Sequence, residues 1–125
     1  NIVGVTSIYA GNAAWALTTN LSTVLLTVAS DVTLKINSII ATNTNATTAT
    51  NLSMDISGLT TSQTGVTIAS GATAIKIAAA IPIPGSDVLS VIDRPIYLME
   101  GDILRGGASV ATCDLFISFE VINDA

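Results

Sequence analysis

The sequence contains no histidine, one cysteine and four basic residues among its 125 positions. The lack of histidine excludes nucleophilic sites that depend on an imidazole base and metal sites built on imidazole ligands. The single thiol, Cys113, excludes an intrachain disulfide, and its apolar neighbours favour a buried side chain over a reactive one. We therefore expect no cofactor, no metal ion and no enzymatic activity.

Charge is also scarce, since only 10% of the residues are charged and the net charge is −5. The basic residues are scattered at positions 35, 76, 94 and 105, whereas nucleic-acid binding needs a clustered basic surface. The sequence also lacks an apolar run long enough for a membrane-spanning helix. Neither nucleic acid nor a membrane is expected as a partner.

The carboxylates are the remaining candidates for chemistry. A glycosidase pair would need two acids across a cleft. The candidates are Asp87, Asp93, Glu100 and Asp102, and they fall at predicted turns and strand ends. Acids at such positions are usually solvated or cap the turn, and no Asp-x-Asp-x-Asp spacing indicates a calcium loop. This distribution favours structural roles for the acids.

Half of the residues are hydrophobic, and they recur with a period of two. The alternation is clear at 32–37, 52–57 and 115–122, and turn residues separate such runs along the chain. The segment 75–83 also keeps this period, and its Pro82 predicts a strand at a sheet edge. The pattern predicts an all-β fold, an antiparallel and jelly-roll-like β-sandwich of about eight strands.

The length is that of a single domain. We expect one sandwich domain over 21–125, preceded by residues 1–20 as an N-terminal arm or first strand that packs on the core or on a partner. This first segment contains Trp15, the only tryptophan. Its indole is expected either to dock on a partner, as interface tryptophans do, or to plug one end of the sandwich.

The segment 81–120 runs through a proline-led strand, a tight Glu100-Gly101-Asp102 turn and a last strand. It resembles the small β-sandwich virion structural proteins of tailed bacteriophages, of the marine and cyanobacterial phage type. The blocks that carry the resemblance are Leu25 to Val28, Thr33 to Asn43 and Arg94 to Arg105, and the likeness extends over Leu21 to Ile122. In one departure, Val28-Ala29-Ser30 stands where that family tends to have proline.

The resemblance implies a virion component, assembled in the cytoplasm of a bacterial host, that decorates or cements the capsid or belongs to the neck or tail. High apolar content with few charges is typical of a subunit with much of its surface in contacts. The expected partners are further copies in a symmetric homo-oligomer, a trimer or higher, and the major capsid or neck and tail proteins. The predicted subunit contacts are Trp15, Ile39, Ile40, Phe116 and Ile122.

A glycan- or receptor-binding module at the particle surface is the alternative function. Such a module needs exposed aromatic rings as stacking platforms, and aromatic residues make up only 4% of this chain. The sequence therefore favours the packing subunit over the binding module.

Overall fold

The computed structural model describes residues 7–60, 62–63 and 65–123, with the side chains at 62 and 63 left aside. These residues form strands and no helix. The strands are β1 (Ser7–Ala16), β2 (Val24–Thr27), β3 (Val32–Asn43), β4 (Thr50–Ser57), β5 (Ser62–Gln63), β6 (Val66–Thr67), β7 (Ile75–Ile83), β8 (Val88–Ile92), β9 (Ile96–Leu98), β10 (Ile103–Ala108) and β11 (Cys113–Asn123).

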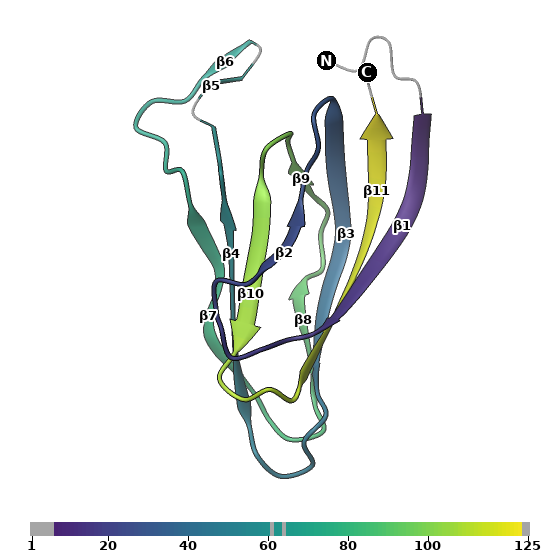
Figure 1. Cartoon of the computed structure of the whole chain (residues 1–125), viewed down its shortest axis with the longest axis vertical. Coiled ribbons are helices and arrows are strands. Elements are labelled where there is room, and N and C mark those ends of the chain that lie inside the picture. The colour runs from purple at the N-terminus through teal and green to yellow at the C-terminus, as the bar shows by residue number, and fades with distance from the viewer. Residues whose placement is uncertain (1–6, 61, 64, 124–125) are drawn as a thin grey trace.

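The strands are arranged as a jelly roll (Figure 1). The first sheet has the order β1-β11-β3-β8, and β9 continues the place of β8 beside β3. The second sheet has the order β2-β10-β4-β7, and β5 and β6 form a separate ribbon. Each sheet thus has four strand positions, and all pairings are antiparallel. Pairing of the first strand with the last and of the second with the last but one is the double Greek-key pattern. The predicted fold is confirmed.

The core lies between the sheets and follows the period-two pattern, with one slip. A register shift between β11 and β3 leaves Asn37 as an extra residue in β3. Because of this bulge, Ile36 and Ile39 both face the core and are completely buried. Strict alternation would have turned Ile39 outward. The prediction that Ile39 makes subunit contacts is therefore wrong, since its side chain has no exposed surface.

The segment around Trp15 is an integral strand, since β1 pairs with β11 without a break from Ser7 to Ala16. It is the first strand of the fold, which was one of the two forms expected for 1–20; residues 1–6 lie outside the described part. Gly11 allows this close pairing, because a side chain there would meet the ring of Phe119 at 2.6 Å. The strand with Pro82, β7, lies at an edge of the second sheet, as predicted.

One end of the sandwich, named here the Asn43 end, is closed by a buried amide. The Asn43 side chain is fully buried and donates to the carbonyl oxygens of Thr48 and Ile83, at 2.8 and 2.9 Å. Its oxygen accepts from the backbone N–H of Asn45 at 3.0 Å and from the hydroxyl of Thr112 at 2.9 Å. This amide therefore ties together the β3–β4 and β10–β11 connections and the end of β7.

The opposite end, named here the Tyr9 end, is open between the sheets. A cavity of about 260 Å³ lies there. In Figure 1 this end is at the top. The lining is almost wholly apolar and consists of Tyr9, Leu26, Thr27, Val28, Ala29, Val32, Leu34, Phe119 and Val121.

Candidate interaction surface

The first sheet turns one face to the core and the other, its outer face, away from it. In β11 the alternation sends Leu115 and Ile117 into the core, while Asp114 and Phe116 point outward. The register then decides which outward residues become neighbours. Phe116 lies between Ala14 of β1 and Ile40 of β3. Three strands far apart in sequence thus contribute to one row.

This row and the next form an exposed apolar surface. The side chain of Phe116 is 40% exposed and that of Ile40 is 37% exposed. The neighbouring row contains Ala16, Asp114 and Thr42, and Val88 of β8 lies opposite Thr42 with 55% exposure. We name this surface the Phe116 patch, and it consists of Ala14, Ala16, Ile40, Thr42, Val88, Asp114 and Phe116.

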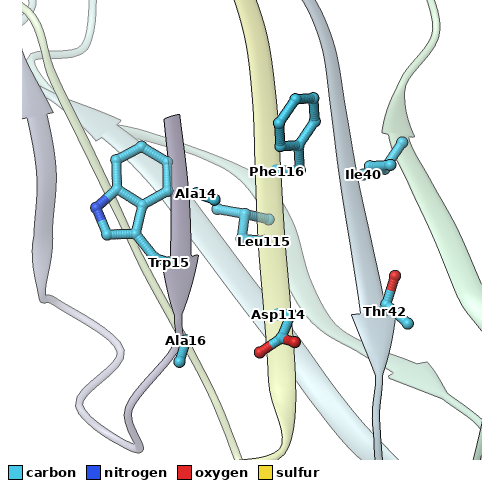
Figure 2. A pocket seen from close by; sticks show the side chains of 8 residues that line it. All are labelled: Ala14, Trp15, Ala16, Ile40, Thr42, Asp114, Leu115 and Phe116. Atoms are coloured by element: carbon cyan, nitrogen blue, oxygen red, sulfur yellow. The ribbon is translucent and has the colours of Figure 1, made fainter. Parts of the chain in front are cut away.

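The patch surrounds a shallow pocket of about 330 Å³. Figure 2 shows Phe116 and Ile40 extending from neighbouring strands at the same level, with Asp114 and Thr42 nearer the Asn43 end. The pocket is lined by two aromatic residues, Phe116 and Trp15, by aliphatic side chains such as Ile40, and by one carboxylate and one hydroxyl. Such a lining suits a protruding apolar side chain or the face of a sugar ring.

The structure brings together two of the predicted contact residues, Ile40 and Phe116. Ile122 lies on the same outer face but at the Tyr9 end, half-buried, where it pairs with the exposed Ile8. Trp15 pairs with Leu115, so it belongs to the inward rows, and its half-buried indole packs against the core. In Figure 2 this indole lies beside β1, on the side away from β11.

Val88 and Ile8 are exposed apolar residues of this face that the sequence reasoning missed. The signal for Val88 was available, because it begins an alternating run with Leu89 and Ser90. Ile8 alternates with Tyr9 in the same way. What was missing was the pairing that places them beside Thr42 and Ile122.

Few charges interrupt the outer face of the first sheet. Lys35 and Glu120 lie opposite each other there, and Asp114 is the only acidic or basic residue of the Phe116 patch. The outer side of the second sheet differs, because Arg105 and Asp55 form a two-bond ion pair across β10 and β4, at 2.8 and 2.6 Å. Loss of water from the outer face of the first sheet therefore requires the desolvation of few charged groups.

The candidate carboxylates serve as turn residues. Burial raises the pKa of Asp102, and a hydrogen bond from the Met99 N–H, at 2.9 Å, opposes this rise. Glu100 accepts from the N–H of Asp31 at 3.2 Å, and Asp87 accepts from the N–H of Val88 at 2.8 Å. Each of these three acids thus accepts a hydrogen bond from a backbone N–H group. Asp93, the fourth candidate, is exposed between β8 and β9.

The Glu100-Gly101-Asp102 turn joins the two sheets at the Tyr9 end. The N–H of Gly101 donates to the carbonyl oxygen of Val28 at 2.9 Å, and the N–H of Val28 donates to that of Asp102 at 3.0 Å. Gly101 has φ of +85°, a conformation that glycine adopts at little cost. This turn, which belongs to the block 94–105, thus links the two sheets through backbone hydrogen bonds.

Cys113 is buried, as predicted, and burial raises the pKa of its thiol, with a smaller contribution from the charge of Asp114. Among the described residues, no group of three or more metal-ligating side chains gathers at one place. That part of the chain also forms no helix capable of spanning a membrane.

Comparison of the sequence and structure with protein-family models, curated proteins and solved structures found no match.

Proposed function

We propose that this protein is a non-enzymatic structural subunit of a tailed-bacteriophage virion, which packs on the capsid as a decoration or cement protein or at the neck or tail. The Phe116 patch is the observation that carries the proposal. Phe116, Ile40 and Val88 expose apolar side chains side by side on a face with few charges. Contiguous exposed apolar surface of this kind marks protein contact sites.

The fold supports the proposal only by analogy. Double-sheet jelly rolls occur in viral capsid proteins and also in lectins, so the architecture is compatible with both packing and glycan binding. The sequence resemblance over 25–28, 33–43 and 94–105 supports the assignment to a tailed phage. Symmetric copies of the chain, as a trimer or higher, and the major capsid or neck and tail proteins are the partners in this proposal.

The test is co-sedimentation of purified protein with tailed-phage particles, together with sedimentation velocity of the protein alone. We expect the wild type to self-associate at high micromolar concentration and to sediment with particles. Replacement of Phe116 and Ile40 together by serine is expected to abolish particle binding. A matched double replacement of Thr67 and Thr73 by alanine, both exposed and outside the first sheet, should leave it unchanged. A monomeric wild type that binds no particle would contradict the proposal.

A particle-surface glycan-binding module is the second candidate, and one observation favours it. The ring of Phe116 lies in the same pocket as the carboxylate of Asp114 and the hydroxyl of Thr42, and sugar sites combine an aromatic face with such polar groups. Saturable binding on a glycan array, lost in Phe116→Ala and in Asp114→Ala, would favour this function over packing. Trp15→Ala tests the second aromatic residue in the lining of this pocket.

A further inference from the structure

The edges of the two sheets are not alike. The second sheet ends at β2, which is only four residues long, and at β7, which contains Lys76, Pro82 and Ala80 with φ of 50°. The first sheet ends on one side at β8 and β9, two short strands separated by residues 93–95. Short strands, proline, lysine and local irregularity are the devices by which proteins prevent other strands from pairing with an edge.

The remaining edge, β1, has none of these devices. Its ten residues pair with β11 in an unbroken register, and they include neither a proline nor a charged residue. Among the described residues, no strand pairs with the other side of β1. A long, regular and uncharged edge presents backbone N–H and C=O groups that can pair with another strand.

We propose that β1 pairs antiparallel with β1 of a second copy of this chain, around a two-fold axis at Asn12. The proposal goes beyond the virion assignment and does not depend on it. A second copy suits this edge because the strand has no charge to repel its own image, although the whole chain has a net charge of −5. A two-fold axis makes this contact self-complementary, so each β1 edge pairs with the β1 edge of one other copy.

The alternation of β1 restricts the possible registers. Even-numbered residues of β1 point outward and odd-numbered ones point toward the core side, as their partners in β11 do. Two copies can continue one sheet only if outward residues meet outward residues, because a slip of one residue reverses the faces. The axis must then lie between one residue and the same residue of the other copy. The two β1 strands overlap over the greatest length when this residue is Gly11 or Asn12.

The axis at Asn12 gives the better side-chain pairs. It places Tyr9 of each copy opposite Trp15 of the other, and aromatic pairs across strands are stabilising. Tyr9 is 55% exposed in the single chain, and Trp15 is half-exposed at this edge. An axis at Gly11 would place Trp15 opposite Ser7. The dimer therefore covers both aromatic side chains and joins the two first sheets into one continuous sheet.

Sedimentation equilibrium of the purified chain tests the proposal. We expect a monomer–dimer equilibrium for the wild type and a dissociation constant raised about tenfold or more in Asn12→Lys, because two lysines then face each other at the axis. Thr67→Lys, which adds the same charge at an exposed position of β6, should leave the constant unchanged. A wild type that stays monomeric at high micromolar concentration, or a dimer that survives Asn12→Lys, would overturn the proposal.

A covalent readout separates loss of pairing from loss of folding. Opposed residues of antiparallel strands have Cα atoms about 4.5 to 5.5 Å apart, within the range of a disulfide. Asn12→Cys is expected to form a disulfide-linked dimer with oxidised glutathione, which takes up the two electrons and is reduced to glutathione. Wild-type protein, whose Cys113 is buried, should not. Failure of the folded Asn12→Cys variant to cross-link would also overturn the proposal.

The Phe116 and Ile40 double variant distinguishes this proposal from the proposed function. It is expected to lose particle binding and to keep the dimer, whereas Asn12→Lys should lose the dimer. If the protein forms the dimer but binds no particle, the pairing of β1 holds and the virion assignment is wrong. If the protein binds particles but forms no dimer, the virion assignment holds and the pairing of β1 is wrong.

Discussion

The Asn43 end and the Tyr9 end of the sandwich are closed by different interactions. At the Asn43 end, directional hydrogen bonds from one buried amide reach three chain segments. At the Tyr9 end, the Glu100-Gly101-Asp102 turn bonds to the β2–β3 connection, and an apolar cavity lies between the sheets. Buried polar networks that are fully satisfied fix a single arrangement, whereas apolar contacts are not directional. The comparison indicates that the fold is fixed at one end and adaptable at the other.

The largest effect is expected from Asn43→Leu at the closed end. Leucine has nearly the same shape, but it removes four hydrogen bonds. They join the Asn43 amide to the carbonyl oxygens of Thr48 and Ile83, to the N–H of Asn45 and to the hydroxyl of Thr112. We expect the free energy of unfolding to fall by about 3–5 kcal/mol. Urea denaturation followed by circular dichroism measures it. Asn51→Leu, at an exposed position of β4, is the control and should change it by less than about 0.5 kcal/mol. If Asn43→Leu and Asn51→Leu lowered the free energy of unfolding equally, the hydrogen bonds of the Asn43 side chain would not be what fixes this end.

A smaller loss is expected from Asp102→Ala at the open end. The replacement removes the acceptor for the Met99 N–H, while the backbone bonds between Val28 and the turn remain. The free energy of unfolding should fall by about 1–2 kcal/mol, measured by the same denaturation experiment. The exposed Asp93 provides the matched control, Asp93→Ala. A loss at Asp102 as large as that at Asn43 would show that both ends are equally fixed.

The smallest effect concerns pH. Burial raises the pKa of Asp102 above its ordinary value of 3.8, so the folded protein retains this proton to a higher pH than the unfolded chain. Its contribution to stability is fully present below pH 3.8 and is lost as the pH rises through the folded pKa. The unfolding free energy of the wild type, relative to Asp102→Asn, should therefore decrease across that window. Denaturation curves at a series of pH values test this, and parallel profiles would contradict it.

The strands and the sheet edge at Pro82 could be predicted from the sequence, because alternation and the missing proline N–H act locally. Ile39 could not be placed correctly, since the bulge at Asn37 arises from pairing with β11 and leaves no local mark. The meeting of Ile40 with Phe116 depends on the same long-range register. Asn43 carried a signal that was overlooked, because it keeps the inward alternation of Ile39 and Ala41 to the end of its strand.

The pairing of β1 with β11 also affects how the chain folds during its synthesis. The register joins Ser7 to Asn123, so most of the chain is synthesised between β1 and its partner residues in β11. Contacts between residues so far apart in sequence form slowly, because the ends of a long loop must meet first. During translation β1 cannot pair with β11 until β11 has been synthesised. Until then the backbone groups of β1 and the Trp15 side chain can contact other chains. A cell that makes many copies at once therefore exposes this strand to its neighbours before the sheet is complete.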